Sequence, residues 1–178
     1  MKLSRLSFVE IGKNGEPIEP VGPLSDAARD VCHKTARLYE PARSYPPWIG
    51  YLVLENDAIV GTCAFRSPPQ NGKVEIAYFT FPGFEGLGFA TEMGRHLIQI
   101  VKDTEPGTRI FAFTLPEKNA SARILQRLGF GFSGETRDED GLVVWQWELP
   151  TVLEFGEGLG GAGSGESGTQ SLSPDSGS

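Results

Sequence analysis

The sequence predicts a single α/β domain, in which a mixed and mostly antiparallel sheet of about six to seven strands is flanked by about three to four helices. Short alternating runs rich in β-branched and aromatic residues recur along residues 5–149, separated by turn residues. Two longer segments carry apolar residues at helical spacing. One of them joins two strand-like runs, which favours a right-handed crossover between parallel strands.

Turn and cap residues predict where these elements begin and end. Asn14–Gly15 ends the first strand, and Asn56–Asp57 has the spacing of an antiparallel hairpin turn. Ser25 is a candidate N-cap for the first helix, and Gly129 ends the last one. The expected strands cover residues 5–11, 50–55, 58–65, 74–81, 109–115, 131–136 and 142–149. The expected helices cover 26–39, 86–102 and a short segment that opens within residues 116–121 and stops at Gly129.

A stiff loop, Y-P-P-W at residues 45–48, precedes the second strand and presents aromatic side chains. Such a loop either anchors the packing of the domain or forms a wall of a substrate pocket. Both interpretations stay open at the level of the sequence.

Composition changes sharply after Pro150. Residues 151–178 contain eight glycines, four acidic residues and no Lys or Arg. We therefore expect a domain at residues 1–150 and a disordered Gly/Ser-rich acidic tail at 151–178. Without the four acids of the tail, the formal charge of −7 becomes −3 for residues 1–150, so a nucleic-acid partner is not expected.

The two cysteines, Cys32 and Cys63, lie far apart and have only His33 and His96 as other soft ligands. Neither a metal site nor a disulfide framework is expected from this spacing. No signal peptide or long apolar run is present, so no membrane association is expected. The expected compartment is the cytoplasm.

Glu75 is a carboxylate within an otherwise apolar strand. Val74, Ile76 and Tyr78 share one face of that strand, whereas Glu75, Ala77 and Phe79 share the other. Burial would raise the pKa of Glu75 toward the range of a general base, but a solvated position at the edge of the strand fits the sequence equally well.

The central strand runs into a glycine-rich turn, P-G-F-E-G-L-G at residues 82–88, and then into a helix. The start of a helix presents unpaired backbone N–H groups and the positive end of the helix dipole, which together bind anions such as phosphate. The turn lacks the third glycine of a dinucleotide fingerprint and the Lys-Ser/Thr of a P-loop. The remaining candidate is a ligand that carries a diphosphate but is recognised by neither of these two motifs.

Two motifs in this order resemble a known family. The run P-G-F-E-G-L-G-F-A-T-E, followed by T-L-P-E-K-N-A-S-A-R-I-L-Q-R-L-G-F, is similar to the GNAT superfamily of acetyl-CoA-dependent N-acetyltransferases, and within it to the branch that includes ribosomal-protein N-terminal acetyltransferases. The resemblance covers residues 48–149. It implies a sheet that is splayed between the Val74 strand and the Arg109 strand, with acetyl-CoA in the opening and no metal.

The resemblance also implies which residues contact the co-substrate. The pantetheine arm would pair with backbone near Phe79, Thr80 and Phe81, and Asn119 would reach the arm or its thiol end, although Asn119 is also a plausible N-cap. Arg95, Arg123 and Arg127 are cations that could meet the phosphates. The N–H groups that would wrap the pyrophosphate belong to Glu85, Gly86, Leu87, Gly88, Phe89, Ala90 and Thr91.

The sequence departs from this family at three positions. Glu85 stands where Gln or Arg is usual, and Leu87 stands where a basic residue is common. A carboxylate beside a pyrophosphate weakens binding unless it points into solvent. Leu125 occupies the site where many relatives have a Tyr that protonates the leaving thiolate.

The expected reaction is attack of a neutral primary amine on the thioester in a ternary complex. Glu75 is the candidate proton acceptor, and the backbone N–H near Thr80 is the candidate donor to the oxyanion. The acceptor is a protein N-terminal α-amine or a small-molecule amine, and the enzyme is a monomer or a homodimer. Two other classes stay open: an inert acyl-CoA-binding module, and an α/β domain with a purely structural glycine turn whose tail recruits partners.

Overall fold

The computed structural model describes residues 6–150, so the expected tail at residues 151–178 lies outside the described residues. Within that range the chain forms a mixed seven-stranded sheet and three helices, which confirms the predicted α/β architecture. The strands are β1 (Leu6–Glu10), β2 (Gly50–Glu55), β3 (Ala58–Phe65), β4 (Lys73–Thr80), β5 (Arg109–Thr114), β6 (Gly131–Arg137) and β7 (Val143–Leu149). The helices are α1 (Asp26–Ala42), α2 (Phe89–Thr104) and α3 (Ala120–Arg127).

The sheet has the strand order β1-β2-β3-β4-β5-β7-β6. Strands β1 to β4 form one antiparallel half, and β5, β7 and β6 form the other. The predicted hairpin between β2 and β3 is confirmed, and its turn residues Asn56 and Asp57 both have positive φ, 48° and 71°. Asn and Asp tolerate this conformation better than most residues, which is why this dipeptide fits a tight turn.

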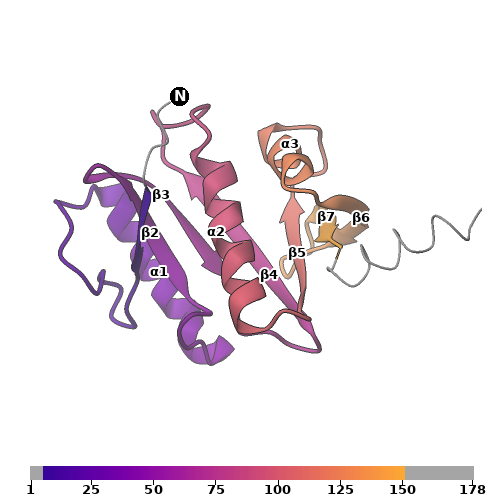
Figure 1. The fold of residues 1–178 in the computed structure, drawn as a ribbon, viewed down its shortest axis with the longest axis horizontal. Helices are drawn as coiled ribbons and strands as arrows, with labels where there is room; N and C mark the ends of the chain where they lie inside the picture. The colour runs from indigo at the N-terminus through magenta and orange to yellow at the C-terminus, as the bar shows by residue number, and fades with distance from the viewer. Residues whose placement is uncertain (1–5, 151–178) are drawn as a thin grey trace, which may run out of the picture.

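The two halves of the sheet meet at β4 and β5, which are parallel neighbours for only three residue pairs, from Lys73↔Arg109 to Glu75↔Phe111. Strand β4 continues to Thr80 without a partner on that side. Figure 1 shows the two strands together at the bottom of the view and apart at the top, where α2 begins and α3 lies. The expected splay of the sheet is therefore confirmed.

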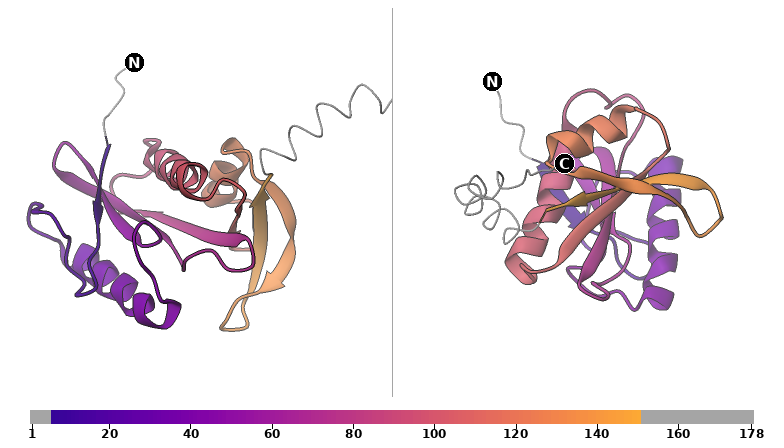
Figure 2. Two further views of the ribbon diagram at one scale, coloured as in Figure 1. Left: turned by 60° about the horizontal axis from the view of Figure 1, so that its bottom comes forward. Right: turned by 90° about the vertical axis from the view of Figure 1, so that its right-hand side faces the viewer.

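Helices cover both faces of the sheet. Helix α2 packs on β3 and β4, whereas α1 packs on β2 and β3. Figure 2 shows α1 and α2 on opposite sides of the strands. The apolar stripe of α2, which includes Met93, Leu97 and Val101, is buried against Val74 and Ile76 of β4 in one core cluster. This stripe explains why the segment folds as a helix on that face.

The bounds of α1 and α2 differ from those expected. Helix α2 begins at Phe89 and not at Gly86, because Gly86 and Gly88 adopt positive φ angles of 77° and 87°, which are outside the helical range. Helix α1 runs past Tyr39 and includes Pro41 in its last turn. That turn is closed by the N–H of Ser44, which donates to the carbonyl of Tyr39 at 2.8 Å.

Candidate active site

The unpaired end of β4 presents backbone groups to the opening between β4 and β5. Strand alternation fixes which ones, because successive residues direct their N–H and C=O groups to opposite neighbours. The carbonyl of Glu75 accepts from Arg66 at 3.1 Å, and the N–H of Phe81 donates to Val60 at 2.8 Å, so both are directed toward β3. The N–H and C=O groups of Tyr78 and Thr80 therefore face the opening.

This alternation separates the three residues that were expected to pair with a pantetheine arm. Thr80 directs its backbone into the opening, whereas Phe79 has Thr62 as its partner on β3 and the N–H of Phe81 is already bonded. Tyr78 was not anticipated, although the same alternation could have identified it. The hydroxyl of Tyr78 donates to the carbonyl of Ser121 in α3 at 3.5 Å, and this hydrogen bond spans the opening. Burial raises the pKa of Tyr78 well above the usual range of a tyrosine.

The glycine-rich turn lies at the wide end of this opening and leads into α2. Gly83, Gly86 and Gly88 all have positive φ, and a Cβ at any of the three would meet no atom within 4 Å. Positive φ, and not crowding, is thus the reason for glycine here. The N-cap residue of α2 is Gly88, which has no side chain to accept from the first N–H groups of the helix. The N–H of Glu92 donates to the carbonyl of Gly88 at 3.2 Å.

The N–H groups of Phe89, Ala90 and Thr91 therefore have no acceptor within the helix. Together with the helix dipole, these unpaired N–H groups are donors of the kind that anions accept. Glu85 and Leu87 are both exposed, and Leu87 has 64% of its surface accessible. An exposed Glu85 carboxylate can stay in solvent, away from a bound phosphate.

Asn119 is the N-cap of α3, on the other side of the opening. Its Oδ1 accepts from the N–H of Ala122 at 3.0 Å, so the capping interpretation holds for this atom. The Nδ2 group of the same side chain is not used by the cap and keeps its donors. Leu125, six residues further along the chain in α3, is fully buried and contributes no polar group.

Glu75 lies on the face of β4 opposite to α2, at the point where pairing with β5 ends. Burial raises the pKa of its carboxyl group, the Arg66 guanidinium opposes that shift, and Glu139 reinforces it. The Nε atom of Arg66 is 3.9 Å from Oε2 of Glu75, and 25% of the Glu75 side chain is exposed. The carboxyl group is thus half-buried, between the two positions that the sequence allowed.

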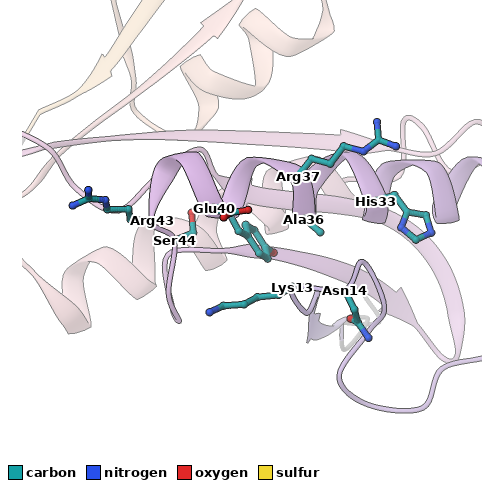
Figure 3. A pocket seen from close by; sticks show the side chains of 9 residues that line it. Lys13, Asn14, His33, Ala36, Arg37, Glu40, Arg43 and Ser44 are labelled. Carbon is teal, nitrogen blue, oxygen red and sulfur yellow. The ribbon is translucent and has the colours of Figure 1, made fainter.

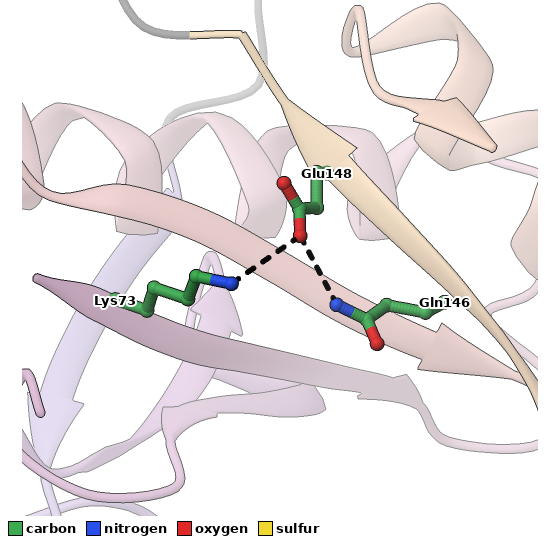
Figure 4. Close-up of polar contacts among 3 residues, drawn as sticks. All are labelled: Lys73, Gln146 and Glu148. Carbon is green, nitrogen blue, oxygen red and sulfur yellow. Dashed lines mark hydrogen bonds and ion pairs between the residues drawn. The ribbon is translucent and has the colours of Figure 1, made fainter. Parts of the chain in front are cut away.

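The Glu75 side chain lines a cavity of about 650 Å³. Residues of α1, β5 and the β6–β7 turn, namely Leu38, Phe111 and Glu139, form other parts of its wall. Beside it, Nζ of Lys73 is 3.8 Å from Oε1 of Glu148, which also accepts from Gln146 at 3.1 Å. Figure 4 shows Lys73 and Glu148 reaching toward one another across β5, with Gln146 beside Glu148, so this contact links β4 to β7 where β4 and β5 are still paired.

A larger cavity, of about 790 Å³, lies between α1 and the loop after β1. Figure 3 shows its lining side chains, which include Lys13, His33 and Glu40. No residue of β4 or β5 lines this cavity, so it is separate from the opening. The loop at residues 45–48 acts as a packing anchor through Trp48, which is 1% exposed and packs edge-on against Phe65.

A family model described as an acetyltransferase (GNAT) domain matches residues 17–131. The chain belongs to the GNAT acetyltransferase family. The match covers strand β4 with Glu75, the glycine-rich turn, and helices α2 and α3, which together make up the candidate site described above.

Relatives and solved structures agree with this assignment. An "uncharacterized N-acetyltransferase p20" from Bacillus licheniformis is 36% identical over 88 residues, which is 49% of each chain, so the match spans about half the length of this curated relative. A RimL ribosomal L7/L12 α-N-protein acetyltransferase has a TM-score of 0.59 at 14% identity, with 82% of this chain and 93% of that chain covered. MccE, a microcin C7 self-immunity acetyltransferase in complex with acetyl-CoA and AMP, has a TM-score of 0.56 at 16% identity, with 71% of each chain covered.

The three expected phosphate-binding cations lie at different places in this GNAT domain. Arg95 forms an ion pair with Glu92 on the exposed side of α2. Arg123 lines a cavity of about 540 Å³ that α3 forms with Phe132 and Trp145 of β6 and β7. Arg127 lies in the last turn of α3, at the opposite end from Asn119. The described residues contain no group of three or more His, Cys, Asp or Glu that could hold a metal ion, and no helix among them is long and apolar enough to cross a membrane.

Proposed function

We propose that this chain transfers the acetyl group of acetyl-CoA to a primary amine by direct attack in a ternary complex. The observation that carries the proposal is the divergence of β4 and β5 beside the uncapped start of α2. Membership of the GNAT family supports it, as does the acetyl-CoA in the complex of MccE, a structure of similar fold.

In this proposal the pyrophosphate of the co-substrate binds at residues 85–91. The N–H groups of Phe89, Ala90 and Thr91 supply donors there, and the positive φ of Gly86 and Gly88 shapes the turn around the anion. The pantetheine arm lies between β4 and β5 and pairs with the backbone of Tyr78 and Thr80. The Nδ2 group of Asn119 donates to the arm from the α3 side of the opening.

The chemical step is nucleophilic addition followed by loss of the thiolate. The amine nitrogen forms a bond to the thioester carbonyl carbon, and the Thr80 N–H donates to the oxygen as it becomes negative. Glu75, directly or through a water molecule, accepts the proton that the nitrogen loses. The C–S bond then breaks, and the coenzyme A thiolate takes up a proton, for which the Tyr78 hydroxyl is our candidate donor because Leu125 offers none.

The acceptor in this proposal is a protein N-terminal α-amine or a small-molecule amine. An α-amine with a pKa near 8 is already partly neutral at pH 7, whereas a Lys side chain needs a stronger base. The single half-buried carboxylate at position 75 therefore favours an acceptor of low pKa. We further propose that the protein acts in the cytoplasm, as a monomer or a homodimer.

A thermal-shift titration followed by a turnover assay tests this function. Acetyl-CoA should raise the melting temperature, because a ligand that binds only the folded state stabilises it, and coenzyme A thiol should appear when a panel of primary amines is added. No shift at millimolar acetyl-CoA would refute the proposal. A shift without thiol release from any amine would instead favour an inert acyl-CoA-binding module, the alternative suggested by the apolar residue at position 125.

A further inference from the structure

The cavity at Glu75 continues into a smaller apolar one. The polar cavity of about 650 Å³ and a second cavity of about 150 Å³ share Leu38 and Arg66 in their walls, so they form one trough between α1 and the sheet. We call the smaller part, lined by Leu38, Ala64, Ala77 and Phe79 among others, the apolar pit.

The pit exists because two small residues lie side by side on the sheet. Ala64 of β3 and Ala77 of β4 are cross-strand partners, and neither side chain rises far above the backbone. Leu38 from α1 and Phe79 from β4 stand beside them and are 40% and 51% exposed. Exposed apolar side chains around a hollow favour occupation by an apolar group.

The position of the pit relative to Glu75 is set by the strand. Ala77 follows Glu75 by two residues on the same face of β4, which places it about 7 Å along the strand. An amine that attacks a thioester held at Thr80 must lie between that residue and Glu75. The substituent on its α-carbon then falls over Ala77, and therefore in the pit.

The polar part of the trough offers hydrogen-bonding groups to the main chain of an acceptor peptide. It extends from Glu75 past Gln70 and Asn71, whose side-chain amides match the hydrogen-bonding groups of a peptide main chain. The carboxylates of Glu75 and Glu139 line this part of the trough together with the cationic side chains of Arg66 and Lys73, so an ammonium ion finds acidic partners within a wall of balanced charge.

From this arrangement we infer that the acceptor is the N-terminus of a polypeptide whose first residue has a large apolar side chain, such as Leu. This inference rests on the proposed acetyl transfer and specifies its acceptor. The side chain of the first residue occupies the apolar pit, the α-amine lies between Glu75 and Thr80, and the following main chain runs past Asn71.

The test compares two tripeptide amides that begin with Leu or Gly and are otherwise identical, together with leucinamide alone. The Leu peptide should show a kcat/KM roughly tenfold or more above that of the Gly peptide, a difference typical of a side chain that fills an apolar pocket. The peptide should also exceed leucinamide. A preference for Gly, or equal values for leucinamide and the Leu peptide, would overturn the inference.

A variant in which a larger side chain fills the pit tests its role. Ala77→Leu places a larger side chain in the pit, and should lower kcat/KM for the Leu peptide roughly tenfold while changing that of the Gly peptide less than about twofold. Ala58→Leu makes the same substitution at an exposed position of β3 outside the trough, and should change neither value. Equal effects of Ala77→Leu on both peptides would contradict a role for the pit.

Calorimetry separates failure of this inference from failure of the proposed function. If no thiol is released from acetyl-CoA with either peptide, acetyl transfer to an α-amine is refuted. The affinity of each peptide in the presence of coenzyme A still shows whether the pit binds an apolar side chain. Tighter binding of the Leu peptide that is lost in Ala77→Leu supports the pit. Equal binding of both peptides to the unmodified protein overturns it.

Discussion

At the scale of single residues, Glu75 combines accessibility with a perturbed pKa. Burial against the sheet raises the pKa of its carboxyl group, and the like charge of Glu139 adds to this, while Arg66 at 3.9 Å works in the opposite direction. A carboxylate with a raised pKa accepts a proton more readily than a solvated one, and general bases in proteins are commonly tuned in this way.

Glu75→Gln should therefore slow turnover by about 100-fold while leaving the Kd of acetyl-CoA unchanged, because the amide cannot accept a proton. Steady-state kinetics and a calorimetric titration measure these two quantities. Glu19→Gln, at an exposed position outside the site, serves as the control. An unchanged rate in Glu75→Gln would show that another group is the base.

The same substitution should stabilise the fold above the raised pKa of Glu75. A carboxyl group whose pKa is raised by folding favours the native state while it is protonated, and this contribution is lost as the pH rises through the raised pKa. Above the raised pKa the native state holds an ionised Glu75 that folding disfavours, so Glu75→Gln should raise Tm there and lose this advantage at low pH. A lower Tm above that pKa would contradict the direction of the shift.

At the scale of elements, the start of α2 determines whether the opening can hold an anion. The alternating run of β4, the glycines after it and the apolar stripe of α2 all have clear sequence signals, and each element is found where it was expected. The first helical residue was placed three positions too early, because periodicity does not reveal that Gly86 and Gly88 have left-handed φ. This shift leaves the unpaired N–H groups at Phe89 and beyond.

Gly88→Ala tests this element. A Cβ at φ 87° costs about 1–2 kcal/mol of backbone strain, so the turn should shift and the KM for acetyl-CoA should rise several-fold. Gly107→Ala is the matched control, since that glycine has open space around it and no positive φ. Equal KM values for the two variants would argue against an anion site at Gly88.

At the scale of the whole molecule, the site arises where two antiparallel half-sheets share only three residue pairs. The strands and hairpins were predictable from alternation and turn residues. The divergence of β4 from β5 was not, because alternation does not reveal how many residues of two parallel strands pair. It was expected only from the resemblance of two motifs. The backbone of Tyr78 could have been assigned to the opening from alternation, but the contact of its phenol with Ser121 in α3 could not, because the two residues are distant in sequence.

Truncation after Pro150 tests the proposed domain boundary. The described fold ends with β7, whose partners β5 and β6 lie upstream, and composition gives residues 151–178 little apolar surface. Removal of residues 151–178 should change Tm and kcat/KM by little. A drop in either would mean that this segment contributes to the domain, and the boundary would have to be placed later.

The central claim is that acetyl-CoA lies in the opening between β4 and β5, with its pyrophosphate at the start of α2. An NMR titration of the ¹⁵N-labelled protein with coenzyme A tests it directly through the backbone amide shifts. The account predicts that the largest shifts occur at Tyr78, Thr80 and residues 86–91. Largest shifts at the residues around the separate cavity, from Lys13 to Ser44, with residues 86–91 unmoved, would contradict it.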